Sequence, residues 1–154
     1  MGLIERFLPD PAATEALAAR LAAGQPARAV VFLAGELGAG KSSLARAWLR
    51  ALGVRGAIRS PTYTLVERYP LPDGGEAVHL DLYRLGSASE LDFLGLDELD
   101  DRARLWLVEW PERGAGALPA PDLRIALAMQ GEGRRARLEA ASPAGGNWLA
   151  RLDE

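Results

Sequence analysis

The chain lacks cysteine and has almost no lysine. With no cysteine in its 154 residues, disulfides and thiolate metal sites are excluded. Of the 18 basic residues, Lys41 is the sole lysine and all the others are arginine. A general need for positive charge does not explain Lys41, because arginine supplies that charge everywhere else. The position requires what arginine lacks, a compact ammonium group that acts as a point charge in a narrow space.

Long apolar runs and a strong excess of one charge are also missing. The net charge of −3 at pH 7 argues against a protein that binds nucleic acid through its overall charge. No apolar run approaches the roughly 18 residues of a membrane span, and the N-terminal segment is unlike a signal peptide. We therefore expect a cytoplasmic protein with no membrane partner. A chain of 154 residues can bury a core of its own, so we expect one domain over residues 1–154.

Short apolar runs alternate with helical and turn patterns along the chain. Asp10 followed by Pro11 is typical of a helix start, and Gly24 is typical of a helix end. The expected helices are 11–24 and 43–52, with a last helical turn at 147–153. A capping-box pattern at 87–90 indicates the start of a further short helical stretch. Gly95 interrupts that stretch. The expected strands are 28–34, 62–69, 76–83, 104–109, 122–129 and 134–140. This order predicts an α/β fold in which a sheet of parallel strands and hairpins is flanked by helices.

A glycine-rich segment, GELGAGKS at residues 35–42, follows the first expected buried strand and opens a helix. It matches the pattern G-x-x-x-x-G-K-S/T, whose backbone N–H groups and helix N-terminus bind phosphates. Lys41 would reach the β- and γ-phosphates, and the Ser42 hydroxyl can bind Mg²⁺. A glycine-rich turn that binds nothing is the alternative, but the strand and helix on either side favour a nucleoside triphosphate site in a P-loop NTPase-like fold. The expected phosphate-binding residues are Glu36, Leu37, Gly38, Ala39, Gly40, Lys41, Ser42 and Ser43.

Two carboxylates follow expected strands. Glu109 ends the apolar run Leu105 to Val108, the Walker-B type of arrangement, and can hold Mg²⁺ directly or through water or orient the attacking water. Trp110 and Pro111 would shield it from solvent. Asp81 is a second candidate, for which the local sequence leaves an ordinary strand-end acid equally open. The candidate catalytic residues are Lys41, Asp81 and Glu109, and the candidate metal ligands are Ser42, Glu109 and Asp81.

Weaker signals come from one histidine and a group of arginines. His79 is the only histidine, so neither a zinc site nor a catalytic triad is indicated, and a packed strand histidine is as plausible as any role. Arg134, Arg135 and Arg137 could border a nucleotide or contact RNA, but a polar strand face explains them more simply.

Three classes of nucleotide-binding protein can be weighed against the sequence. A GTPase needs an Asn-Lys-x-Asp motif, which a chain with Asn147 and Lys41 as its sole asparagine and lysine cannot contain. A small-molecule kinase of shikimate-kinase type needs an acceptor region and an arginine-bearing lid, whereas the loop 113–121 is mostly Gly, Ala and Pro. A nucleotide sensor without enzymatic activity differs in not turning ATP over.

Four further segments resemble the TsaE (YjeE) family. In chain order they match its patterns S-P-T-F/Y-T-L, H-x-D-L-Y-R-L, E followed by G-L/I-x-E, and E-W-x-E. Together with the glycine-rich segment they cover about residues 30 to 112, most of the chain. The matching residues are 60–65, 79–85, Glu90 with 95–98, and 109–112.

The resemblance implies a cytoplasmic bacterial ATPase of low intrinsic activity that uses ATP and Mg²⁺. Such a protein assists threonylcarbamoylation of the adenosine beside the tRNA anticodon. It acts with transferase-complex proteins of the TsaB and TsaD type, so it meets tRNA only through that complex. Carried over to this chain, Lys41 binds phosphate, Ser42 and Glu109 serve Mg²⁺, and Asp81 lies in a switch-like segment beside the metal. The other switch-like residues would be Ser60, Pro61, Thr62, Tyr63 and Thr64, with Trp110.

Overall fold

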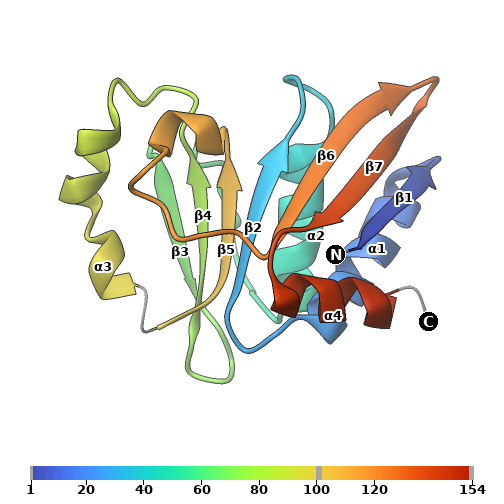
Figure 1. The fold of residues 1–154 in the computed structure, drawn as a ribbon, viewed down its shortest axis with the longest axis horizontal. Coiled ribbons are helices and arrows are strands. Elements are labelled where there is room, and N and C mark those ends of the chain that lie inside the picture. Colours follow the sequence, from blue (N-terminus) through green and yellow to red (C-terminus); the bar gives the residue numbers. More distant parts are fainter. Residues whose placement is uncertain (1, 100–101, 153–154) are drawn as a thin grey trace.

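The computed structural model describes residues 2–99 and 102–152, whose strands form one seven-stranded sheet in the order β1-β7-β6-β2-β5-β4-β3 (Figure 1). Strand β2 is parallel to both of its neighbours, β5 and β6, and β4 is parallel to β5. The pairs β3–β4, β6–β7 and β1–β7 are antiparallel. The strands are β1 Leu3–Leu8, β2 Ala29–Ala34, β3 Val66–Pro70, β4 Glu76–Asp81, β5 Ala103–Glu109, β6 Leu123–Gln130 and β7 Gly133–Ala140.

Helices cover both faces of the sheet and define two apolar cores. One core contains Leu21, Trp48 and Trp148, which come from α1 (Pro11–Gly24), α2 (Lys41–Ala51) and α4 (Pro143–Leu152). The other contains Leu91 and Trp106 and lies toward the short elements η1 (Ala88–Leu94), α3 (Leu96–Leu99) and η2 (Pro111–Gly114). The expected α/β class, a mixed sheet flanked by helices, is confirmed.

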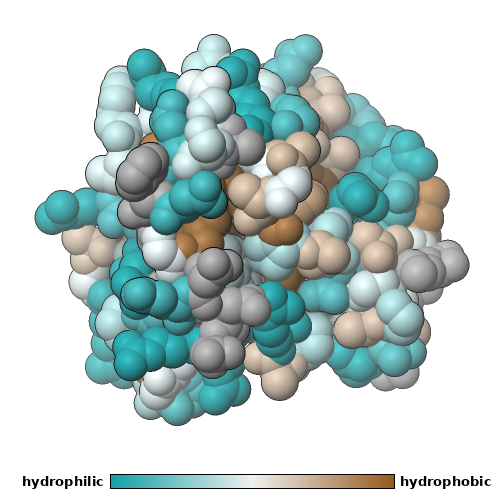
Figure 2. Space-filling view, turned by 60° about the vertical axis from the view of Figure 1, so that its left-hand side comes forward, coloured by the Kyte–Doolittle hydropathy of each residue, from teal (hydrophilic) through white to brown (hydrophobic). Residues whose placement is uncertain are grey.

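The surface is mixed in polarity on the side that carries α3 and the β3–β4 hairpin. Figure 2 shows hydrophilic residues over most of this side, with apolar residues gathered near its middle. None of the helices in the described ranges has the length and apolar character needed to cross a bilayer.

The structure differs from the sequence prediction at the ends of several elements. Strand β1 is not among the expected strands, although Ile4 and Leu8 are buried at this edge of the sheet. Strand β3 begins at Val66 rather than Thr62, because residues 61–64 form a turn and Leu65 has a φ of 69°. Strand β4 ends at Asp81 rather than Tyr83, because the Tyr83 N–H turns back to donate to the Asp81 carboxylate.

Two helix starts and one helix cap also differ from the prediction. Helix α2 begins at Lys41, two residues before the expected start, because Gly40 in the left-handed region serves as its N-cap. Helix α4 begins at Pro143 rather than Asn147, since the Ser142 hydroxyl accepts a hydrogen bond from the Gly145 N–H and caps the first turn. The capping box expected at 87–90 does not form: the Ser87 and Ser89 hydroxyls bond to each other, and no side chain caps the 3-10 helix η1.

Replacement of Gly145 by alanine is expected to destabilise the fold by about 3 kcal/mol, the upper range for overpacking. A Cβ at Gly145 would lie 1.9 Å from the Asp122 carbonyl oxygen, so α4 could no longer approach β6. The adjacent Gly146 faces open space, and Gly146→Ala should be neutral or stabilise by up to about 1 kcal/mol through helix propensity. Urea unfolding of both variants measures the difference. Equal stabilities would contradict the close approach at Gly145.

Candidate nucleotide-binding site

The parallel strands β2, β4 and β5 bring three sequence-predicted segments to one edge of the sheet. The segment 35–42 follows β2, Asp81 ends β4, and Glu109 ends β5. Since the carboxyl ends of parallel strands meet at the same edge, residues that are far apart in the chain become neighbours there. The register pairs Asp81 directly with Glu109.

The backbone of the segment 35–42 has the form of a phosphate cradle. Gly35, Gly38 and Gly40 have φ values of 145°, 84° and 107°, which strain other residues. A Cβ at Gly35 would lie 2.5 Å from the Leu127 carbonyl oxygen. Helix α2 follows without a side-chain cap, so its first N–H groups are free for an anion. Ala39 is buried, whereas Glu36, Leu37, Gly38, Ser42 and Ser43 are exposed.

Lys41 lies in a confined position within this cradle. It is only 5% exposed, and its ammonium donates a hydrogen bond to the Gly35 carbonyl oxygen. The ammonium nitrogen also lies 4.4 Å from the centroid of the Trp110 ring, in a cation–π contact. Trp110 has a φ of 56°, and its ring packs on Tyr83 with 5.0 Å between the ring centroids. The narrow space inferred from the single lysine is therefore present around Lys41.

The two carboxylates are buried and each is held by a polar partner. Asp81 accepts hydrogen bonds from the Tyr83 N–H at 3.0 Å and from the Thr62 hydroxyl at 3.4 Å. Glu109 Oε2 lies 2.6 Å from His79 Nε2. Within residues 2–99 and 102–152 no three His, Asp or Glu side chains are grouped so as to hold a metal ion. Carboxylate and hydroxyl oxygens are ligands that suit Mg²⁺, which also takes phosphate oxygens and waters. The oxygen atoms of Ser42, Asp81 and Glu109 therefore suit a Mg²⁺ ion that is bound together with a nucleotide.

The switch-like segment 60–64 reaches the same edge through Thr62. The Ser60 and Thr62 hydroxyls lie 2.7 Å apart, while Thr64 donates to Glu67. Pro61 is buried, whereas Tyr63 is 81% exposed and its ring lies 4.7 Å from the Arg84 guanidinium, measured from the ring centroid. The structure thus joins Thr62 to Asp81 and leaves Tyr63 on the surface.

The Tyr69 hydroxyl anchors the start of this segment. It accepts from the Arg59 N–H at 3.0 Å and donates to the Arg59 carbonyl oxygen at 3.1 Å. Burial raises the pKa of the Tyr69 phenol above its ordinary value. The anchor places Ser60 beside the site while leaving residues 60–64 without regular structure.

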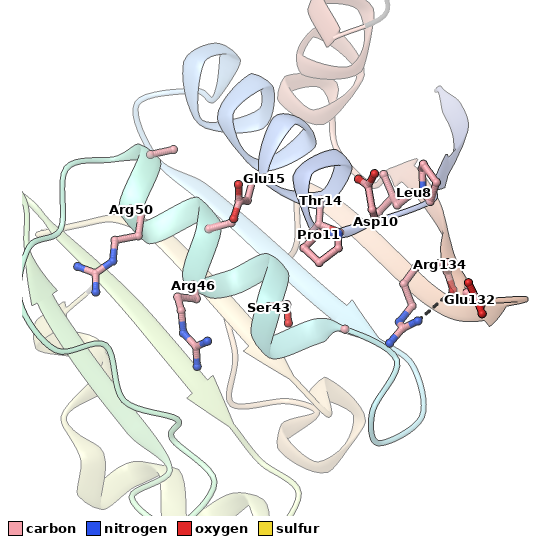
Figure 3. Close-up of a pocket in the computed structure, with 15 residues that line it drawn as sticks. Leu8, Asp10, Pro11, Thr14, Glu15, Ser43, Arg46, Arg50, Glu132 and Arg134 are labelled. Carbon is pink, nitrogen blue, oxygen red and sulfur yellow. Dashed lines mark hydrogen bonds between the residues drawn. The ribbon is translucent and has the colours of Figure 1, made fainter.

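A cavity of about 770 Å³ adjoins the cradle, and no local sequence pattern predicts it (Figure 3). Arg134 reaches from β7 toward the turn before α2, where it donates to the Gly38 carbonyl oxygen at 3.4 Å. Its Nε is buried and has no partner among the residues that the structure describes. Arg135 and Arg137 are exposed instead. The cavity is lined by residues 8–11, 14, 15, 40, 43, 46, 47, 50, 51 and 132–134.

Two comparisons with known proteins agree on one family. The family described as threonylcarbamoyl adenosine biosynthesis protein TsaE matches residues 8–137. The chain is 40% identical over 121 residues to a tRNA threonylcarbamoyladenosine biosynthesis protein TsaE from Haemophilus influenzae, covering 79% of this chain and 76% of the relative. It is 35% identical over 127 residues to the protein of the same name from Bacillus subtilis, covering 82% and 78%.

Among solved structures, the crystal structure of YdiB from Bacillus subtilis superimposes with a TM-score of 0.81. The two are 26% identical in sequence, and the match covers 99% of this chain and 95% of that one. The resemblance carried by the ordered motifs is thus confirmed over most of the chain. The chain belongs to the TsaE family of threonylcarbamoyl adenosine biosynthesis proteins.

Proposed function

We propose that this protein is a Mg²⁺-dependent ATPase that supports threonylcarbamoylation of the adenosine next to the tRNA anticodon. The observation that carries the proposal is the convergence of Lys41, Asp81 and Glu109 at one edge of the sheet, beside a cradle of left-handed glycines. The relatives support the pathway, since they are tRNA threonylcarbamoyladenosine biosynthesis proteins.

The proposed chemistry consists mainly of positioning and charge neutralisation. The cradle N–H groups and the start of α2 bind the phosphates, and Lys41 neutralises the β- and γ-phosphates. Ser42 and Glu109, with Asp81 close by, would hold Mg²⁺, which when bound offsets the charge that builds up on the phosphate oxygens. Glu109 would also orient the attacking water, and burial beside Trp110 keeps bulk water away from it.

The nucleoside part of ATP is assigned to the cavity beside Gly40 and Ser43. Its volume of about 770 Å³ lies in the range typical of small-molecule sites. Arg134, which borders both the cavity and the cradle, is placed to contact the ribose or a phosphate.

We assign the contact with a transferase complex of the TsaB and TsaD type to the edge that holds residues 60–64 and Trp110. Tyr63 and Leu37 are 81% and 70% exposed beside the site, and exposed aromatic or aliphatic groups are typical of protein interfaces. Thr62 bonds to Asp81, so a change at the nucleotide would be transmitted to this surface. With a net charge of −3, contact with tRNA is expected only through the complex.

Purified protein with Mg-ATP is expected to release phosphate slowly to water and to phosphorylate no sugar or shikimate-like acceptor. The reason is that the loop 113–121 is mostly Gly, Ala and Pro, and its arginine, Arg113, lies over the Tyr83 ring, 5.5 Å from the ring centroid. Phosphate release and ADP formation are measured with and without a panel of acceptors. Acceptor-dependent ADP formation far above background would favour a kinase of shikimate-kinase type, and binding of ATP without turnover would favour a nucleotide sensor.

A further inference from the structure

His79 is a buried polar side chain that the proposed chemistry does not use. It is 3% exposed, lies on β4 two residues before Asp81, and therefore faces the same side of the sheet as Asp81. The parallel register of β4 with β5 brings it close to Glu109, with 2.6 Å between His79 Nε2 and Glu109 Oε2. A histidine that only filled space would not need this polar contact.

The hydrogen-bond partners of the pair favour one tautomer of His79. Carboxylate oxygens only accept hydrogen bonds, so the arrangement that pairs His79 with a Glu109 carboxylate has His79 Nε2 donating to Glu109 Oε2 across 2.6 Å. His79 Nδ1 is buried and has no hydrogen-bond partner among the described residues. A proton on Nδ1 would therefore have no acceptor there. Glu109 Oε1 has no hydrogen-bond partner in the same part of the chain. One oxygen of Glu109 is thus held and the other is available.

We propose that His79 is a positioning residue that holds Glu109 Oε2 and so presents Oε1 for work at the nucleotide. This inference rests on the proposed ATPase function and names a residue that acts through Glu109. A carboxylate on a side chain as long as glutamate samples several rotamers, and a charge-assisted bond to one oxygen removes that freedom. Outer partners of metal-binding groups characteristically alter affinity or activity by about 10–100-fold when they are replaced.

The proton position can be read directly, because His79 is the only histidine in the chain. Uniformly ¹⁵N-labelled protein without a histidine tag gives one set of imidazole signals. The expected spectrum has the proton on Nε2 and a bare Nδ1, and the Nε2–H signal should lose its hydrogen-bond shift in Glu109→Ala. A proton on Nδ1, or a spectrum unchanged in Glu109→Ala, would overturn the proposal without any assay of activity.

Two substitutions separate positioning from packing. His79→Gln keeps an N–H donor near the place of Nε2, whereas His79→Leu fills the space and donates nothing. Calorimetry should show that His79→Leu binds ATP with wild-type affinity in EDTA. With Mg²⁺ present, its affinity for ATP should be about tenfold weaker than that of wild type. With Mg²⁺ in excess, the kcat of His79→Leu for phosphate release should fall about tenfold, while its KM for ATP changes less. Both quantities should stay within about threefold of wild type in His79→Gln.

The possible results lead to different conclusions. Equal Mg²⁺ dependence and kcat in wild type and His79→Leu would overturn the role of His79 alone. Equal losses in His79→Gln and His79→Leu, with folding of both verified by urea unfolding, would reduce His79 to a packing residue. Wild-type protein that binds ATP without any Mg²⁺ dependence would overturn the proposed function and this role with it.

Discussion

Lys41→Arg is expected to weaken ATP binding almost as severely as Lys41→Ala. The ammonium of Lys41 lies between the Gly35 carbonyl oxygen and the Trp110 ring, and only 5% of the residue is exposed. A guanidinium keeps the charge but is a planar fork, wider than an ammonium. Inserting it would displace Trp110 or the backbone of the cradle. Calorimetry should show a loss of at least about tenfold in affinity for both variants, or about 1.4 kcal/mol.

Arg104 provides the matched control, because it is exposed and lies at the end of β5 away from Glu109. Arg104→Lys exchanges the same two residue types in the other direction and should bind ATP as wild type does. If Lys41→Arg bound ATP within about threefold of wild type, well under 1.4 kcal/mol, the requirement for a compact ammonium would be refuted. The single lysine of the chain would then be an accident of composition.

The parts of the fold that the sequence predicts well are those with a local signal. The runs before Gly35 and Glu109 are apolar because both strands lie in the middle of the sheet, and that burial is visible in the residues themselves. The turn around Gly131 and the helix start at Asp10 likewise depend on neighbouring residues alone. Strand β1 at the sheet edge has a weaker pattern, because one of its faces is exposed.

The unpredicted parts of the site depend on pairing between distant segments. His79 meets Glu109 only through the register of β4 with β5, 30 residues apart. Arg134 reaches the cradle across 96 residues, and nothing in its own neighbourhood distinguishes it from the exposed Arg135 and Arg137. The turn at Leu65 replaces an expected strand, although leucine rarely adopts a positive φ. The structure places Lys41, Asp81 and Glu109 together, while their catalytic roles stay predictions.

Glu109→Gln is expected to abolish ATP hydrolysis while preserving entry into the transferase complex. The amide has the shape of the carboxylate, and its oxygen can still accept from His79 Nε2, so local structure should persist. It carries no charge and is a poor base, so phosphate release should fall by about 100-fold or more. Mg-ATP should still bind, with reduced affinity if Glu109 touches the metal directly. In a reconstituted system the variant should fail to support multiple turnovers of tRNA threonylcarbamoylation.

The expected failure follows from how little chemistry the chain itself contains. Its described residues supply a glycine-rich cradle, two buried carboxylates and a switch-like segment joined to Asp81 through Thr62. Under the proposed function, a partner would read the state of the γ-phosphate through that segment. Glu139→Gln makes the same chemical change on the exposed side of β7 and should behave as wild type throughout. A single round of tRNA modification by Glu109→Gln would still be compatible with a resetting role for hydrolysis. Full multiple-turnover activity, with ATPase activity shown to be absent, would instead refute the coupling of hydrolysis to the transferase.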